Sequence, residues 1–164
     1  MASIPFDKLG GKLWYNGEMV DWDEGRLHIL SHGLHYGSCV FEGERAYGGK
    51  IFKHQEHTDR LFKSAEILGM DIGYSNKELY DAAYTSLEAQ GFTDAYVRPV
   101  AWRGSEMMAI SAQQTTTHVA VICWDMGSYF DPEARMAGIK LQWAKYKRPS
   151  PECAPVHAKA AGLY

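Results

Sequence analysis

The sequence has few cysteines, no long apolar run and no excess of charge of one sign, and each absence argues against a class of protein. Its three cysteines, Cys39, Cys123 and Cys153, are an odd number without metal-binding spacing, which fits a reducing cytoplasm better than a disulfide scaffold. No apolar stretch reaches about 18 residues and no signal-peptide pattern follows Met1, so we expect neither a membrane span nor export. A net charge of −3 leaves no basic footprint for nucleic acid.

What remains is the composition of a globular protein, with short strands predicted near the N-terminus. The chain has 164 residues, 46% of them hydrophobic, which suffices for one domain or for one domain and a piece of another. Asn16-Gly17 separates two β-prone runs, and this dipeptide is a strong hairpin signal. Gly48-Gly49 divides a second pair of runs, within residues 40–52, and predicts a second hairpin.

Two helices are predicted after these hairpins. Over residues 56–68 the apolar positions recur on one helical face, and Gly69 is a natural C-terminal stop. The second helix begins at Ser75, which forms a capping box with Glu78, and it ends near Gly91.

Strand character returns in three later runs, at residues 95–102, 118–124 and 139–146. Strands followed by paired helices and further strands predict an α+β fold in which helices cover one face of a sheet. We expect residues 1–126 to form a small domain and residues 127–137 to form a linker. Residues 138–164 would begin a second, incomplete domain, because one strand and a loop cannot bury a core.

Five motifs stand in a fixed order along the chain, at residues 31–37, 41–47, 56–61, 95–99 and 159–164. In order and spacing they resemble those of branched-chain-amino-acid aminotransferases. The resemblance covers the whole chain, but only about the first half of a typical family member. It implies the small N-terminal α+β domain of a fold-type IV pyridoxal-phosphate enzyme and the opening of its large domain. A homodimer or higher homo-oligomer is the implied assembly.

Lys159 is the candidate catalytic residue. It stands between Ala158 and Ala160, and a lysine among small residues can be packed closely by a flat ring and form a Schiff base with an aldehyde. The resemblance implies that Lys159 binds pyridoxal 5'-phosphate in this way and then moves the proton at the substrate Cα. The alternative is an ordinary surface lysine.

Two further residues are implied to bind the cofactor. Arg60 matches the arginine that grips the phosphate, for which a planar, permanently charged fork is suited. Its alternative is an i,i+4 ion pair with Glu56 on the helix surface. Tyr164 matches the tyrosine that hydrogen-bonds the phenolic oxygen of the cofactor.

Aromatic residues are implied to bind the substrate side chain. The resemblance implies that the aromatic wall of the substrate side-chain pocket is formed by Tyr36, Phe41, Trp124 and Tyr129. Such residues supply rigid apolar area for a leucine, isoleucine or valine side chain, although core packing would use them equally well.

A carboxylate trap and a loop complete the implied substrate site. Tyr96 and Arg98 match the motif that binds the second carboxylate of glutamate or 2-oxoglutarate, and an arginine in an apolar strand is costly to bury without an anionic partner. Met108, Ala109 and Ile110 match a loop that reaches into the partner subunit's active site, with a plain core anchor as the alternative.

Three histidines and one glutamate are further candidates for a functional role. The histidines 32, 35 and 57 lack the carboxylate or cysteine partners of a ligand set, so we expect them to be structural and expect no metal site. Glu44 stands where many relatives carry an aliphatic residue, in a strand that passes near the implied substrate pocket. It would either shift specificity or mark a subgroup.

The implied reaction is transfer of an amino group between L-leucine, L-isoleucine or L-valine and 2-oxoglutarate, giving the branched-chain 2-oxo acid and glutamate. The family's partner for the pyridine nitrogen and most phosphate contacts would lie beyond Tyr164, so the C-terminal half is needed for activity. Two alternatives stay open. One is a non-catalytic fragment that folds or dimerises without cofactor. The other is a D-amino-acid aminotransferase or an aminodeoxychorismate lyase of the same fold, against which the motif at residues 96–99 argues.

Overall fold

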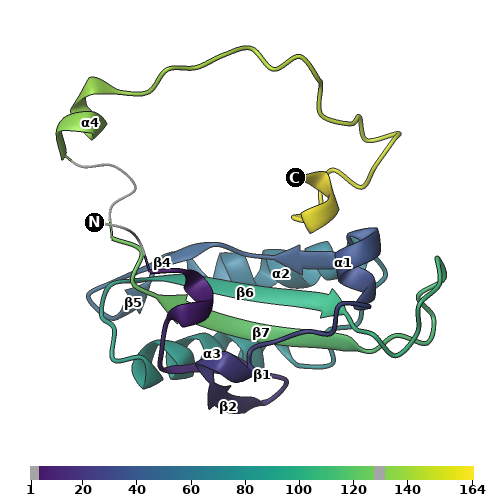
Figure 1. Ribbon diagram of the computed structural model, residues 1–164, viewed down its shortest axis with the longest axis horizontal. Coiled ribbons are helices and arrows are strands. Elements are labelled where there is room, and N and C mark those ends of the chain that lie inside the picture. The colour runs from purple at the N-terminus through teal and green to yellow at the C-terminus, as the bar shows by residue number, and fades with distance from the viewer. Residues whose placement is uncertain (1–3, 128–131) are drawn as a thin grey trace.

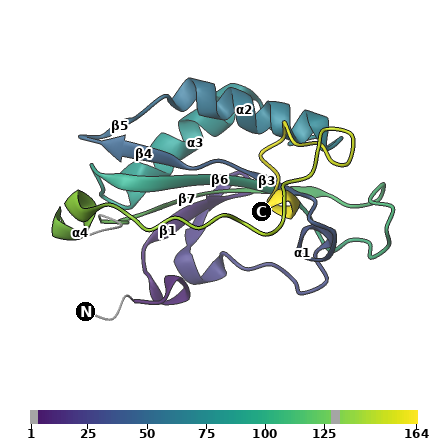
Figure 2. The same cartoon turned by 90° about the horizontal axis from the view of Figure 1, so that it is seen from above.

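The body of the molecule is one antiparallel sheet with two long helices packed on one face (Figures 1 and 2). The computed structural model describes residues 4–127 and 132–164, within which seven strands join the sheet. The strands are β1 (Lys12–Tyr15), β2 (Glu18–Asp21), β3 (Cys39–Phe41), β4 (Glu44–Tyr47), β5 (Lys50–Ile51), β6 (Ala95–Arg103) and β7 (Thr117–Trp124). The helices are α1 (His32–Tyr36), α2 (His54–Ile67), α3 (Asn76–Ala89) and α4 (Pro132–Ala137), with 3-10 turns η1 (Phe6–Lys8), η2 (Trp22–Glu24) and η3 (Ala161–Leu163).

The strand order is β2-β1-β7-β6-β4-β5, with β3 also paired to β6. The centre is the long pair β6–β7, which runs from Tyr96 opposite Trp124 to Arg103 opposite Thr117. Figure 2 shows α2 and α3 on one side of the sheet and the N-terminal segment with α1 on the other. The predicted α+β fold, with helices covering one face, is confirmed.

The two predicted hairpins and both long helices are confirmed, and their local causes are visible. Asn16 (φ 48°) and Gly17 (φ 98°) both adopt the left-handed backbone that a two-residue hairpin turn needs. Helix α2 begins at His54 rather than at residue 56. Helix α3 has the predicted capping box, in which Glu78 N–H donates to Ser75 Oγ and the Glu78 carboxylate accepts from Ser75 N–H.

Side chains alternate across the sheet and divide it into two faces. Val97 and Ala101 of β6 are fully buried in one core cluster with Leu61 of α2 and Ala83 of α3. We call this side the closed face. The alternate residues of β6, Tyr96, Arg98, Val100 and Trp102, point to the opposite side of the sheet, which we call the open face. This alternation sets which residues can meet a ligand.

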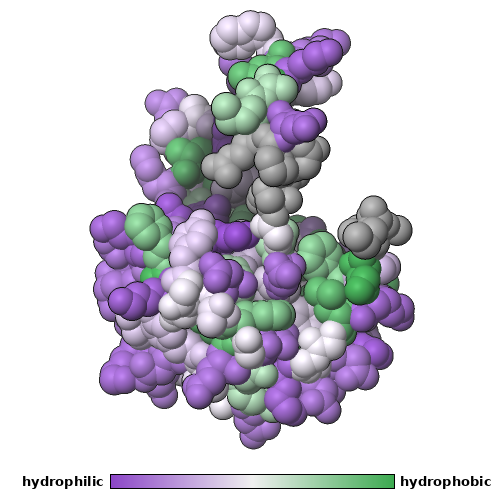
Figure 3. Space-filling view, turned by 90° about the vertical axis from the view of Figure 1, so that its left-hand side faces the viewer, coloured by the Kyte–Doolittle hydropathy of each residue, from purple (hydrophilic) through white to green (hydrophobic). Residues whose placement is uncertain are grey.

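The strand predicted at residues 139–146 is wrong. Residues 138–150 have no regular structure apart from a bend at residues 145–146, and Leu141 and Trp143 are 86% and 98% exposed. A strand needs a neighbour to satisfy its backbone groups, and no strand of the described sheet lies beside this run. Figure 3 shows α4 standing out from the body of the molecule. The expected division at residues 126 and 137 stays a prediction.

No helix in the described part of the chain combines the length and the apolar character that crossing a bilayer requires.

Candidate active site

The Lys159 segment is fixed between a strand and a helix. Phe41 N–H donates to the Lys159 carbonyl at 3.2 Å, and Lys159 N–H donates to Ser64 Oγ at 2.9 Å. Ala160 forms an antiparallel bridge with Val40 at the edge of the sheet. Ala158 and Ala160 are 5% and 3% exposed within the core cluster, so the small residues around the lysine let its backbone pack tightly. Sequence reasoning did not identify Ser64.

The Lys159 amine lies among aromatic groups. Nζ donates to the Tyr164 hydroxyl at 3.2 Å and lies 4.7 Å from the centroid of the Phe41 ring. The side chain is half-buried, whereas Tyr164 is 75% exposed. The Lys159 amine therefore has a hydrogen-bond acceptor and an aromatic face as neighbours, so it is not surrounded by solvent alone.

Arg60 is held by a buried carboxylate. Its Nε and Nη2 donate to the two oxygens of Glu42 at 2.5 and 2.6 Å, and the Glu42 side chain is completely buried. The hydrogen bond to Glu42 raises the pKa of Arg60, burial opposes it, and the nearby ionisable group of Tyr164 adds to it. The alternative pairing with Glu56 is wrong, because Glu56 pairs with Lys53 instead.

A second buried carboxylate lies on the closed face next to the first. Glu44 Oε2 accepts from His54 Nδ1 at 2.7 Å, while His54 Nε2 donates to the Tyr80 carbonyl at 3.0 Å. Burial lowers the pKa of His54, but these hydrogen bonds raise it more, so its net pKa is raised. Glu44 therefore faces the helices, and whether it shifts specificity or marks a subgroup stays a prediction. Its Oε1 has no hydrogen-bond partner among the described residues.

Arg98 lies on the open face without an anionic partner among the described residues. Its Nη2 donates to the Tyr96 hydroxyl at 2.8 Å, and its guanidinium carbon lies 4.7 Å from the Phe41 ring centroid. Its Nε is buried and has no hydrogen-bond partner within residues 4–127 and 132–164, and the same is true of Trp124 Nε1. Trp124 packs against Tyr96 with ring centroids 4.7 Å apart. Two buried N–H donors are thus available to a ligand.

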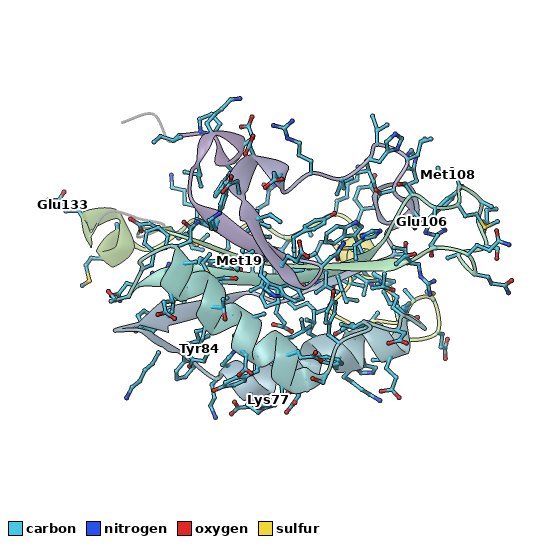
Figure 4. The ribbon with its side chains drawn as sticks, turned by 90° about the horizontal axis from the view of Figure 1, so that it is seen from below. Met19, Lys77, Tyr84, Glu106, Met108 and Glu133 are labelled. Atoms are coloured by element: carbon cyan, nitrogen blue, oxygen red, sulfur yellow. The ribbon has the colours of Figure 1, made fainter. Side chains whose placement is uncertain are left out.

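Both of these donors belong to residues that line an open cavity of about 930 Å³ on the open face. Its wall includes Tyr15, Trp22, Trp102 and Ile122 besides Arg98 and Trp124. In Figure 4, viewed from below, the N-terminal segment covers the side of the sheet opposite to α3, which carries the labels Lys77 and Tyr84. A mostly apolar cavity with a few fixed polar groups is typical of a small-molecule site.

Several predicted residues lie outside this cavity. Phe41 and Tyr96 contact Arg98, but neither lines the cavity, and Tyr36 is half-exposed against the His32 ring. Figure 4 shows Met108, with Glu106, on the loop beyond the end of β6. Met108, Ala109 and Ile110 on this loop do not line the cavity. Ile110 is 85% exposed. Tyr129 falls outside the described residues.

Two of the cysteines are held in the thiol form by burial, and the described residues contain no cluster of metal ligands. Burial raises the pKa of Cys39 to about 11 and that of Cys123 to about 12, so both stay as thiols near neutral pH. Within residues 4–127 and 132–164 no three histidine, cysteine or acidic side chains are grouped as metal ligands.

Known proteins similar to this chain are aminotransferases. Residues 39–162 match the model of the family described as amino-transferase class IV. The branched-chain-amino-acid aminotransferase of Pseudomonas aeruginosa is 40% identical over 158 residues, which cover 94% of this chain and 52% of that protein. The chain spans about half the length of the curated relatives it matches.

Solved structures agree with the sequence relatives. A T.th. branched-chain amino acid aminotransferase with pyridoxamine 5'-phosphate matches with a TM-score of 0.88 and 34% identity, over 94% of this chain and 52% of that one. The same enzyme complexed with N-(5'-phosphopyridoxyl)-L-glutamate matches with a TM-score of 0.86 and 32% identity, over 94% and 51%. The fold is that of the N-terminal half of these enzymes, and the chain belongs to the class IV aminotransferases.

Proposed function

We propose that this chain forms part of an enzyme that transfers an amino group between L-leucine, L-isoleucine or L-valine and 2-oxoglutarate. The observation that carries the proposal is the surroundings of Phe41. Its ring centroid lies 4.7 Å from both the Lys159 amine and the Arg98 guanidinium. A primary amine and a cation that lacks an anionic partner among the described residues therefore both contact the Phe41 ring.

The residues present fit pyridoxal 5'-phosphate. Lys159 offers the amine for its aldehyde, Tyr164 a phenol at 3.2 Å from that amine, and Arg60 a guanidinium for its phosphate. When bound, the cofactor supplies an electron sink for the substrate carbanion. The part left to this chain is to bind the cofactor, to move the proton between Lys159 and the substrate Cα, and to orient the substrate.

Substrate recognition follows from the two free donors. Arg98 Nε and Trp124 Nε1 lie in a largely apolar environment, so a ligand that carries a carboxylate and an apolar chain would satisfy both. The same arginine would bind the second carboxylate of glutamate or 2-oxoglutarate. The exposed loop with Met108, Ala109 and Ile110 would contact the other subunit of a homodimer, and Tyr36 would join the aromatic wall. We place the enzyme in the cytoplasm.

The test is a substrate comparison with the full-length protein and with residues 1–164 alone. We expect the full-length protein with pyridoxal phosphate to convert L-leucine and 2-oxoglutarate and to be inactive with D-alanine. We expect residues 1–164 alone to be inactive. Turnover of D-alanine without L-leucine would favour the D-amino-acid enzyme, and no turnover of any amino acid would favour a non-catalytic protein.

A further inference from the structure

The most heavily bonded buried group outside the proposed reacting set is the Glu42 carboxylate. It is completely buried and accepts from Arg60 Nε and Nη2 and from His57 Nδ1, the last at 2.8 Å. It follows Phe41 directly, so neighbouring residues of one extended segment point to opposite sides. Phe41 meets the Lys159 amine, and Glu42 meets the helix that carries Arg60.

The pairing fixes the orientation of the Arg60 guanidinium. A two-point contact through Nε and Nη2 prevents rotation about the last bonds of a flexible side chain. It leaves Nη1 without a bond to Glu42, while Nη2 also lies 3.4 Å from His57 Nδ1. The Arg60 side chain is 52% exposed although its partner is fully buried. One edge of the guanidinium therefore faces inward to Glu42 and the other faces outward.

Charge alone does not explain this arrangement. A carboxylate bonded to a phosphate-binding arginine weakens its attraction for the phosphate, because it neutralises the cation. If anion affinity depended only on charge, Glu42 would be harmful. Its benefit must come from geometry, since a preorganised fork loses less side-chain freedom when it binds.

We propose that Glu42 is a positioning residue, which holds the Nε–Nη2 edge of Arg60 and thereby presents the opposite edge to the phosphate of the cofactor. This rests on the proposed function, because it takes pyridoxal phosphate as the ligand. The proposal gives Glu42 an effect on the phosphate of the cofactor alone. Glu42 acts on the phosphate through Arg60 and not on the aldehyde at Lys159.

The test compares the dissociation constants of pyridoxal phosphate and of pyridoxal, which lacks the phosphate, by equilibrium dialysis with the full-length protein. We expect Glu42→Gln to weaken binding of pyridoxal phosphate about 10-fold, the effect of losing a charged hydrogen bond, and to leave pyridoxal within about 2-fold. Glu42→Asp keeps the charge but withdraws the carboxylate from Arg60, and it should weaken pyridoxal phosphate as well. In an Arg60→Lys background, Glu42→Gln should have no further effect.

The matched control is Glu44→Gln. Glu44 is an equally buried carboxylate two residues along, but it bonds His54 and not Arg60. Glu44→Gln should lower the melting temperature about as much as Glu42→Gln does. It should leave the ratio of the dissociation constants of pyridoxal phosphate and pyridoxal unchanged. This separates a positioning effect from general damage to the fold.

Three results would overturn the proposal. If the unmodified protein binds pyridoxal phosphate but Glu42→Gln binds it as tightly or more tightly, Glu42 does not position Arg60 and this inference alone is refuted. An equal loss for pyridoxal would mean that Glu42 only supports the fold. If the unmodified protein binds neither compound, the proposed function itself fails and this inference fails with it.

Discussion

The two faces of the sheet differ in how completely their polar groups are satisfied. On the closed face the buried carboxylates of Glu42 and Glu44 pair with Arg60 and His54 of α2, although Glu44 Oε1 keeps no partner among the described residues. On the open face Arg98 and Trp124 each keep a buried N–H without a partner among the described residues. Pairing stabilises the first face, whereas the second leaves binding capacity to a ligand. The difference indicates where this chain folds and where it functions, and four changes would break or sharpen it.

The largest expected effect is on the closed face. Leu61 is 1% exposed in the core, so Leu61→Ala should lower the free energy of unfolding by about 3 kcal/mol through lost burial and a residual cavity. Urea denaturation followed by circular dichroism measures this. The exposed Ile67→Ala on the same helix is the control and should cost far less. Equal costs would show that α2 does not pack as described.

Arg98→Met addresses the open face. We expect kcat/KM for 2-oxoglutarate to fall about 100-fold, because the second carboxylate loses its charged partner. The apolar 2-oxo acid of leucine should be affected less. Stability should hardly change, because Arg98 makes no ion pair within the described residues and donates one side-chain hydrogen bond. A large loss of stability with no change in substrate preference would place Arg98 among the structural residues.

Ser64→Ala tests the contact between helix α2 and the Lys159 segment. It removes the acceptor of the Lys159 N–H and should lower the free energy of unfolding by about 1 kcal/mol while weakening cofactor binding a few-fold. Ser86→Ala is the matched control, because Ser86 is equally buried and donates to the Val121 carbonyl away from Lys159. It should cost similar stability without affecting the cofactor. A cofactor effect in both variants would show that Ser64 has no special link to Lys159.

The smallest expected effect is a pH dependence from the closed face. The raised pKa of His54 means that the folded state binds this proton more tightly than the unfolded state. Its stabilisation is therefore complete below its ordinary value of 6.5 and is lost as pH rises through the higher folded value. Melting temperatures across this range should fall with pH, and His54→Gln should flatten that part of the curve. An unchanged slope in the variant would assign the dependence to another group.

How much of this could be predicted from the sequence depends on the range of each interaction. The turn at Asn16-Gly17 and the capping box at Ser75 are local, so residue type alone predicted them. The Lys159–Ser64 bond joins residues 95 positions apart, and no periodicity indicates it. The strand predicted at 139–146 failed because strand propensity has no effect without a neighbouring strand.

The sequence contains a signal for the pairing of Arg60 with Glu42. In the extended run from Val40 to Ala46 every second side chain points to the same side. Glu42 and Glu44 therefore lie on the same buried side as the apolar Val40 and Ala46. An acidic residue at such a position needs a cationic partner. The nearest helix offers one at Arg60, one turn after His57.

The central claim is that Lys159 is the residue that binds the cofactor. The most direct measurement is to add pyridoxal phosphate to the full-length protein, reduce with borohydride and map the modified peptide by mass spectrometry. The account predicts one pyridoxyl group, on Lys159, and none in Lys159→Ala. A modification on another lysine, or none in the unmodified protein, would contradict it.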